Sequence, residues 1–200
     1  RQMCIRDRIV AKAGFEANII ENHDQPRGAS LFIPEEDYGF YSLSALATII
    51  FCERGLPFLY QGQEIGMSNR QWKYDEFNDL ETINQYQIAL KAGMSKEQAL
   101  EIARHHSRDN ARTPMQWSSE ENAGFSKGKP WMPVNENYKV VNVAEEEKEY
   151  GSILNFYKRL IAFYKSEEYN EILTYGDFGP MYEKEDHIFA YSRSYGCLLY

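Results

Sequence analysis

Two polar segments far apart in the chain carry the side chains best suited to chemistry. Residues 16–27 read EANIIENHDQPR, so that an apolar run gives way to Asn22, His23 and Asp24. Residues 108–117 read RDNARTPMQW and begin with Arg108. A guanidinium is a rigid fork of donors that can hold a carboxylate and a hydroxyl together. A buried strand that ends at Asn22 would deliver His23 and Asp24 to a rim, which is how α/β barrels present reactive groups.

The elements around the first segment follow from its apolar pattern. A short buried strand is predicted over residues 17–21, with Ile19 and Ile20 at its centre. Helical spacing of apolar residues predicts a helix over 37–54 that stops before Gly55. A second buried strand is predicted over 57–60, followed by a turn at residues 61–62.

The second segment lies inside a long polar stretch. Helices are predicted over 80–92 and 96–106, the latter with a start signal at Ser95. Residues 107–150 are rich in Asn, Pro, Gly and Trp and are expected to be mostly irregular. An amphipathic helix is predicted over 152–165, and strands are predicted at the end of the sequence, over 172–175, 187–192 and 197–200.

These passages resemble the α-amylase superfamily of glycoside hydrolases, in its oligo-1,6-glucosidase and α-glucosidase branch. Asn-His-Asp at the end of the seventh barrel strand is one of four short signature regions of that family, and the other three do not occur here. The resemblance continues in order through LPFLYQGQEIGMSN at 56–69, DLET at 79–82 and GFSKGKPW at 124–131. It covers roughly residues 15 to 200.

The resemblance implies an α/β fold: the C-terminal part of a (β/α)8 TIM barrel, followed by the start of an antiparallel β-sandwich domain. A complete barrel needs about 250 residues, more than the 200 of this chain. Residues 9–166 would hold the last two βα units with a long insertion after the eighth strand. Residues 167–200 would begin the C-terminal β domain.

The resemblance also implies roles for four residues. Asp24 corresponds to a third carboxylate that grips ring hydroxyls of the sugar, beside the nucleophile and the general acid of a retaining glycosidase. His23 would donate a hydrogen bond to a neighbouring hydroxyl. Arg108 would reach the sugar at the closed end of the pocket, and Glu81 would accept hydrogen bonds from the next sugar. Glu64 is interpreted as structural, and Arg112 as holding its loop.

Each of these residues also has a plainer interpretation. The Asn-His-Asp run could be a polar turn in which Asp24 caps a backbone amide. Arg108 and Asp109 could form a surface ion pair, and Glu81 could be a solvated helix residue. The unbroken run of motifs favours the binding roles for Asp24 and Arg108, and leaves the two interpretations of Glu81 open.

Composition restricts the partners. The chain has 22 basic and 30 acidic side chains, a net charge of −8 and no basic stripe, so nucleic acid is an unexpected partner. No apolar run is long enough to span a bilayer. Three cysteines without paired spacing favour a reducing compartment, and we expect a cytoplasmic protein. No metal site or organic cofactor is predicted, although the part that would precede this chain could carry a calcium loop.

The predicted function is that of a fragment of a retaining exo-acting α-glucosidase acting on short α-1,6- or α-1,4-linked gluco-oligosaccharides. The fragment would be inactive alone, because the nucleophile and the acid/base residue lie on earlier strands. A trehalose-6-phosphate hydrolase or a sucrose isomerase of the same superfamily is an alternative. A glucosidase-like transporter subunit without catalysis is a third possibility. The oligomeric state stays open.

The first eight residues, RQMCIRDR, do not fit the resemblance. They match the in-frame translation of a transposase adaptor used in DNA sequencing libraries. We expect residues 1–8 to be a non-native segment.

Overall fold

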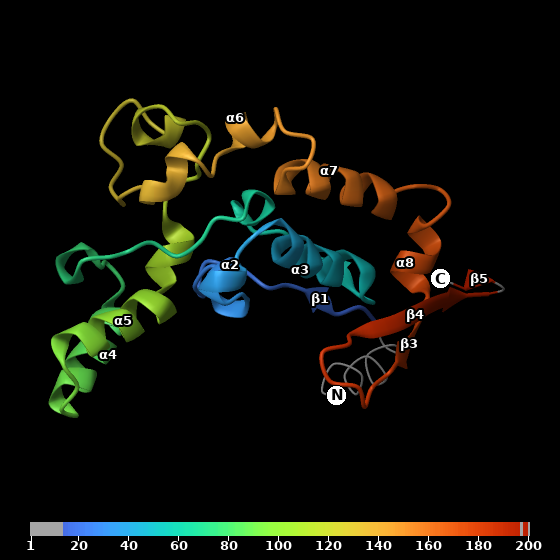
Figure 1. The fold of residues 1–200 in the computed structure, drawn as a ribbon, viewed down its shortest axis with the longest axis horizontal. Coiled ribbons are helices and arrows are strands. Elements are labelled where there is room, and N and C mark those ends of the chain that lie inside the picture. The colour runs from blue at the N-terminus through green and yellow to red at the C-terminus, as the bar shows by residue number, and fades with distance from the viewer. Residues whose placement is uncertain (1–13, 197, 200) are drawn as a thin grey trace. The chain divides into compact units, whose positions relative to one another are not determined.

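A computed structural model describes residues 14–196, 198 and 199 of the chain. The segment 1–8, expected to be non-native, therefore lies outside the described residues. Two compact units are present, and each has its own arrangement (Figure 1). One contains residues 14–19, 45–58 and those from 157 onward, and the other contains residues 20–44 and 59–156.

The first unit contains a pair of parallel strands. Strand β1 (Ala17–Asn18) pairs with β2 (Leu56–Pro57), with Ala17 opposite Leu56. Both strands are shorter than predicted, and the expected burial is wrong here, since Ile19 is 46% and Phe58 51% exposed. A parallel strand is buried when other elements cover both faces of its sheet. Among the described residues this sheet has only these two strands.

Helix α3 (Phe40–Cys52) confirms the helix predicted before Gly55. Asn18 of β1 contacts the end of this helix, because its Nδ2 donates to the carbonyl oxygens of Ile50 in α3 and of Glu53 just after it, at 3.0 and 3.3 Å. Gly55 follows with φ of +143°, and a Cβ there would lie 2.3 Å from Asn18 Oδ1. The stop after this helix therefore requires glycine.

The end of the chain is partly helical where strands were expected. Helix α7 (Ile153–Tyr164) agrees with the amphipathic pattern. Residues 172–175, predicted as a strand, belong to helix α8 (Asn170–Tyr175), in which Ile172 and Leu173 are buried. A four-residue apolar run does not distinguish a strand from a buried helical turn, and here packing selects the helix.

An antiparallel sheet follows α8. It has the order β3-β4-β5, with β3 at Asp177–Met181, β4 at Ala190–Tyr195 and β5 at Leu198–Leu199 (Figure 1). Strand β3 was not predicted, and the strand expected over 187–192 is shifted toward the C-terminus. His187 has φ of +64°, a turn conformation that excludes it from a strand.

Buried Arg193 on β4 joins three elements of the first unit. Its guanidinium donates to the carbonyl oxygen of Cys52 at 2.9 Å and to that of Gly176 at 2.8 Å. These carbonyls lie at the C-terminal ends of α3 and α8. A cation at a helix C-terminus satisfies carbonyls that have no partner within the helix.

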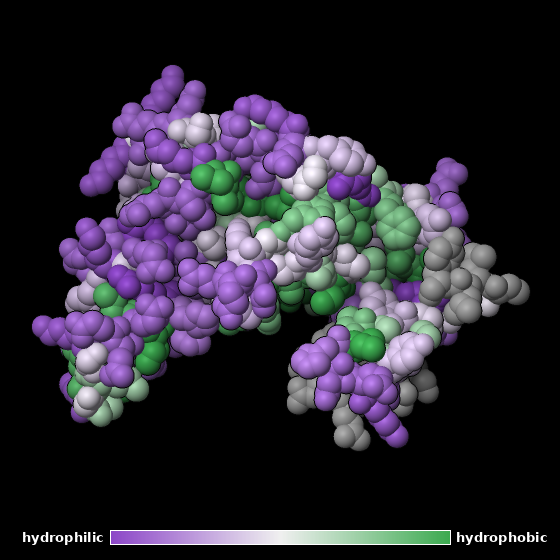
Figure 2. Space-filling view, in the orientation of Figure 1, coloured by the Kyte–Doolittle hydropathy of each residue, from purple (hydrophilic) through white to green (hydrophobic). Residues whose placement is uncertain are grey.

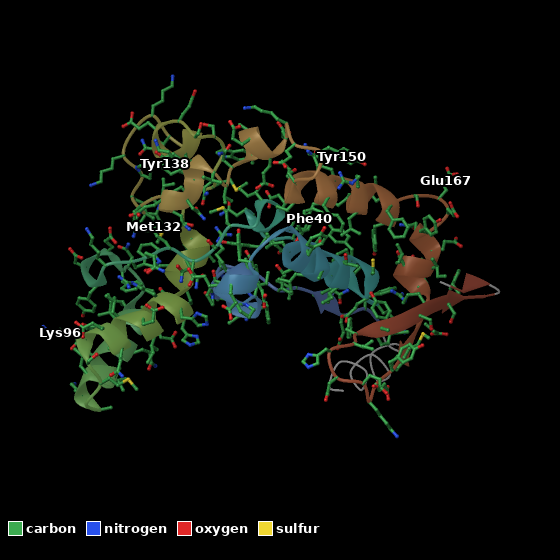
Figure 3. All side chains as sticks on the ribbon, in the orientation of Figure 1. Phe40, Lys96, Met132, Tyr138, Tyr150 and Glu167 are labelled. Carbon is green, nitrogen blue, oxygen red and sulfur yellow. The ribbon has the colours of Figure 1, made fainter. Side chains whose placement is uncertain are left out.

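The second unit is built around two helices that lie side by side (Figure 1). Helices α4 (Leu80–Lys91) and α5 (Lys96–His106) agree with the predicted ranges. The start signal is confirmed as a capping box, in which Ser95 Oγ accepts from the amide of Gln98 and Gln98 Oε1 accepts from the amide of Ser95. Figure 3 labels Lys96, the first residue of α5.

A core of buried side chains underlies these helices: Trp72, Phe77, Tyr86, Ala99, Ala103 and Met132. The rest of the second unit is mainly loop, as predicted for 107–150. It includes the short helices α2 (Gly28–Phe32) and α6 (Val143–Glu146). Single 3-10 turns lie at Glu35–Asp37, Gln63–Ile65, Tyr74–Glu76, Arg108–Arg112, Glu121–Gly124 and Glu136–Lys139.

The described helices are too short or too polar to cross a lipid bilayer.

Candidate functional site

The loop at residues 22–24 presents two open polar side chains. Asn22 Oδ1 accepts a hydrogen bond from the amide of Asp24 at 2.8 Å, which closes a local turn. His23 Nε2 lies 3.2 Å from Asp24 Oδ2, and both side chains are more than half exposed. The capping group of this turn is thus Asn22. The carboxylate of Asp24 remains available for other partners.

Two arginines from the second polar segment contact Asp24. Arg112 donates from Nη2 to Asp24 Oδ1 at 3.1 Å and from Nε to the carbonyl oxygen of His23 at 2.9 Å. Arg108 Nη1 lies 3.5 Å from the same Oδ1. The sequence interpretation limited Arg112 to its own loop, whereas the structure places it directly on Asp24. The two polar segments identified in the sequence therefore meet at one carboxylate.

Arg108 also contacts the beginning of helix α4. Its Nη2 lies 2.5 Å from Asp79 Oδ1 and 3.6 Å from Glu81 Oε2. The four residues proposed from the sequence, Asp24, His23, Arg108 and Glu81, thus form one continuous group. Asp79, which the sequence analysis missed, makes the shortest of these contacts. The sequence could have indicated Asp79, because it directly precedes a predicted helix, a position where aspartate is favoured as the N-cap.

Asp79 is buried, and both oxygens of its carboxylate accept hydrogen bonds. Its carboxylate accepts from the amide of Thr82 at 3.2 Å and from Thr82 Oγ1 at 2.7 Å, as the N-cap of α4. Burial acts to raise the pKa of Asp79, but the hydrogen bonds from Arg108 and Thr82 outweigh burial and hold this pKa at about 2. Asp79 is therefore an anion at neutral pH and fixes the guanidinium of Arg108.

These side chains line a pocket of about 330 Å³ between α4 and α5. Asp24, Arg108 and Glu81 lie on its polar side, and Tyr86 and Ile102 belong to its apolar side. Ligand pockets of proteins begin at about this volume and combine apolar walls with a few polar groups. The pocket offers carboxylate acceptors, a guanidinium and the imidazole of His106 to a ligand with many hydroxyl groups.

The loop that carries Arg108 is anchored by its next two residues. Asp109 Oδ2 accepts from the amides of Asn78 and Asp79 at 2.7 and 2.9 Å. Asn110 is fully buried and accepts from the amide of Arg70 and from Trp72 Nε1, at 2.9 and 2.7 Å. In the run RDN, Arg108 therefore faces the pocket, whereas Asp109 and Asn110 are buried and hold the loop in place.

The loop at residues 22–24 is anchored by a buried ion pair. Arg27 Nη1 lies 3.3 Å from Glu21 Oε2, and neither side chain is accessible to solvent beyond 2%. Arg27 also donates to the carbonyl oxygens of Gln61 at 2.6 Å and of Asn110 at 3.2 Å. Arg27 therefore connects the loop at residues 22–24 and the loop that carries Arg108 to the turn at residues 61–62. Burial raises the pKa of Glu21, against the lowering effect of Arg27.

Glu64 does not line this pocket. Glu64 accepts from the amide of Gly62 at 2.8 Å, within its own turn. Within the described part of the chain, no group of three histidine, cysteine or acidic side chains could hold a metal ion. The site as described is a binding surface of charged and polar side chains.

Comparison with known proteins identifies the family. Residues 4–176 match the family model described as the α-amylase catalytic domain. The chain belongs to this family. The resemblance seen in the sequence is confirmed, and the α/β fold is that of part of an α-amylase catalytic domain.

Relatives of this α-amylase family member include enzymes with different names. An oligo-1,6-glucosidase of Bacillus cereus is 41% identical over 185 residues, which are 92% of this chain and 33% of that protein. The trehalose-6-phosphate hydrolase of Bacillus licheniformis has a similar structure, with a TM-score of 0.87 and 39% identity over 94% of this chain and 34% of that one.

An isomaltulose synthase of a Klebsiella species also has a TM-score of 0.87, at 36% identity over 98% of this chain and 35% of that one. The chain thus spans about a third of the length of these relatives.

Proposed function

We propose that this chain is the C-terminal part of a retaining exo-acting α-glucosidase that hydrolyses short α-1,6- or α-1,4-linked gluco-oligosaccharides. The observation that carries the proposal is the position of Asp24, which lines an open pocket together with Arg108 and Glu81. The similarity to an oligo-1,6-glucosidase supports it. The nucleophile and the general acid would come from residues outside this chain.

In this proposal Asp24 accepts hydrogen bonds from two adjacent hydroxyls of the glucosyl ring. Such bonds strengthen as positive charge develops at the anomeric carbon, so Asp24 stabilises the transition state more than the bound substrate. His23, 3.2 Å from Asp24, donates to a neighbouring hydroxyl. Arg108 binds the same ring while Asp79 holds its guanidinium in place.

Glu81 is proposed to accept hydrogen bonds from the next sugar, on the leaving-group side. Its carboxylate is 66% exposed and points to the same pocket as Arg108.

The alternative functions are a trehalose-6-phosphate hydrolase and a sucrose isomerase. The structural similarity to enzymes of both kinds supports keeping them. A transporter subunit without catalysis is less favoured, because His23, Asp24 and Arg108 are all retained as a connected group.

The test is a substrate panel on the full-length protein: isomaltose, maltose, sucrose and trehalose 6-phosphate. We expect the highest kcat/KM on isomaltose or maltose, with α-glucose as the first product in NMR spectra. A preference for trehalose 6-phosphate, or conversion of sucrose into an isomer, would establish an alternative instead. The 200-residue chain alone should not hydrolyse a chromogenic α-glucoside.

Residues 9–166 would be the last two βα units with their insertion, and 167–200 the start of an antiparallel β-sandwich, for which the sheet β3-β4-β5 is the support. The reaction needs a small oligosaccharide and no organic cofactor. A cytoplasmic location is proposed from the cysteine content alone.

A further inference from the structure

Two acidic side chains of the second unit lie beside one apolar cluster and take no part in the proposed reaction. Glu146 is the last residue of α6, and Glu64 lies in the 3-10 turn Gln63–Ile65. The cluster consists of Ile65, Met67, Met115 and Leu154, with Val141 and Val143 packed against it. Ile65 follows Glu64 in sequence, and the amide of Leu154 donates to Glu146. The two carboxyl groups therefore flank the place where this turn packs against the start of α7.

Glu146 is bound to the start of α7 by its backbone and by its side chain. Its carbonyl oxygen accepts from Ser152 Oγ at 2.7 Å and from Asn155 Nδ2 at 3.0 Å. Its carboxyl group accepts from the amide of Leu154 at 3.0 Å. This amide lies in the first turn of α7, where backbone donors have no acceptor within the helix. The position of the Glu146 carboxyl group therefore decides whether this amide has a partner.

Glu64 and Tyr38 hold the turn at its two ends. Glu64 Oε2 accepts from the amide of Gly62 at 2.8 Å. The hydroxyl group of Tyr38 donates to the carbonyl oxygen of Gly66. A change in the position of Glu64 would therefore reach the backbone of the turn directly.

The side chains that act on Glu146 are acidic or neutral. Burial has the largest effect on its pKa, the amide of Leu154 opposes it, and repulsion from Glu64 and Glu149 adds to it, so that this pKa is raised to about 7. Burial, then repulsion from Glu146, raises the pKa of Tyr38 to about 12. The first turn of α7, ILNF at residues 153–156, has no titratable side chain. The buried position of Glu146 therefore suits its neutral form.

The outer surface of α6 can accept an ionised Glu146. This surface, at the top of the view in Figure 2, is mainly hydrophilic. Glu145, Glu147 and Lys148 are exposed there, and Lys148 Nζ is paired with Glu145 Oε1 at 2.8 Å. A carboxylate that turns outward regains the hydration that burial withholds. It then gives up the amide of Leu154, which only the inward position can reach.

We propose that Glu146 and Glu64 form a latch, operated by one proton, between the turn at residues 61–66 and the start of α7. When Glu146 is protonated, its carboxyl group stays beside Glu64, accepts from the Leu154 amide and keeps the latch closed. When Glu146 loses this proton, its carboxylate turns to solvent, and both the turn and the start of α7 loosen. The latch is therefore closed in mild acid and opens as the pH rises.

The test follows backbone amide signals of the 15N-labelled 200-residue chain by NMR from about pH 6 to pH 8. The Leu154 amide should shift with a midpoint near the pH of about 7 at which Glu146 ionises. The Gly62 amide, whose acceptor is Glu64, should shift with the same midpoint. The amide of Gln98 in the α5 capping box is the reference. Its signal should stay in place, which also reports that the chain is folded.

Three variants separate the latch from other titrations. Glu146→Gln should remove both shifts, because the new side chain does not ionise and can still accept from Leu154. Glu147→Gln, at the exposed next position, is the matched control and should keep them. Glu64→Gln should lower the midpoint at Leu154 by roughly half a pH unit, since one repelling charge is removed. Shifts that survive in Glu146→Gln, or a Leu154 shift without a Gly62 shift in the parent, would overturn the proposal.

The effect of the latch on catalysis rests on the proposed function. Arg27 donates to the carbonyl oxygen of Gln61 at 2.6 Å and thereby connects this turn to the Asp24 pocket. In the full-length protein, the ratio of kcat at pH 8 to kcat at pH 6 on isomaltose should be at least about twofold higher in Glu146→Gln than in the parent. An equal ratio would overturn this link to the pocket. The NMR shifts together with a full-length protein that hydrolyses no α-glucoside would remove the proposed function and retain the latch.

Discussion

Arg112 and Asp24 contact each other across 88 residues, with Arg112 Nη2 3.1 Å from Asp24 Oδ1. The same guanidinium donates through Nε to the carbonyl oxygen of His23 at 2.9 Å. One side chain thus fixes both the carboxylate and the backbone that precedes it. The direction in which Asp24 faces the pocket therefore depends on the second loop.

Replacing Asp24 by Asn should lower kcat of the full-length protein about 10² to 10³-fold, with little change in KM, because the lost interaction acts mainly in the transition state. Steady-state kinetics on a chromogenic α-glucoside measure this. Asp37→Asn, which removes an exposed carboxylate elsewhere in the same unit, is the control and should leave kcat unchanged. An Asp24→Asn protein with the parent kcat would exclude the proposed role.

Arg112→Lys should lower kcat roughly ten- to a hundredfold in the full-length protein while the protein stays folded. The planar guanidinium of Arg112 donates to Asp24 and to the His23 carbonyl oxygen at the same time, and a single lysine ammonium cannot copy this arrangement. The Asp24 carboxylate would therefore lose its orientation. The measurements are kcat, KM and the melting temperature. Arg159→Lys, at an exposed position of α7, serves as the matched control. A fall in melting temperature without a fall in kcat would indicate a purely structural role.

Asp79 predicts a loss of stability in acid. The folded pKa of about 2 lies below the ordinary value of 3.8, so the stabilisation is present above pH 4 and is lost as the pH falls toward 2. At pH 6, Asp79→Asn should therefore lower the free energy of unfolding by roughly 2 kcal/mol. Urea unfolding measured between pH 6 and pH 3 should show that the difference in free energy of unfolding between parent and variant becomes smaller as the pH falls. A gap that stays constant with pH would contradict the depressed pKa.

Glu146 predicts the opposite dependence on pH. Burial, then repulsion from Glu64 and Glu149, raises the pKa of Glu146 to about 7, although the amide of Leu154 donates to it at 3.0 Å. Its favourable contribution is complete below about pH 4.5 and is lost as the pH rises through 7. Glu146→Gln keeps the acceptor for Leu154 and removes the charge.

The Glu146→Gln chain should therefore be more stable than its parent at pH 8, by roughly 1 kcal/mol after allowance for solvent screening, and similar to it at pH 5. Melting temperatures at the two pH values test this. Glu147→Gln, at the exposed next position, is the control. Equal melting temperatures of variant and parent at pH 8 would refute the expectation.

Arg193→Met should lower the free energy of unfolding by about 2 to 4 kcal/mol. The substitution leaves the buried carbonyl oxygens of Cys52 and Gly176 without their charged donor. Urea unfolding of the chain measures the loss, and Arg159→Met, at an exposed position, is the control. Similar losses in both variants would mean that these two hydrogen bonds contribute little.

The sequence by itself determined those helices whose spacing of apolar residues and whose capping residues lie within a few positions of each other along the chain. The ranges of α4 and α5, the Ser95 capping box and the stop of α3 before Gly55 follow from helical spacing and capping residues. The motifs also indicated the family and predicted that Asp24, His23, Arg108 and Glu81 belong to one site. A short apolar run such as 172–175 lacked a distinguishing local signal, and its prediction as a strand was wrong.

Only the tertiary structure decided which charged groups face each other. The contact of Arg112 with Asp24 and the hold of Asp79 on Arg108 depend on how two distant loops are anchored by buried Arg27 and Asn110. Contacts of this kind leave no periodic pattern, because a single long side chain can reach many partners. Periodicity reports the face of one helix or strand, whereas a polar site is assembled from the ends of several.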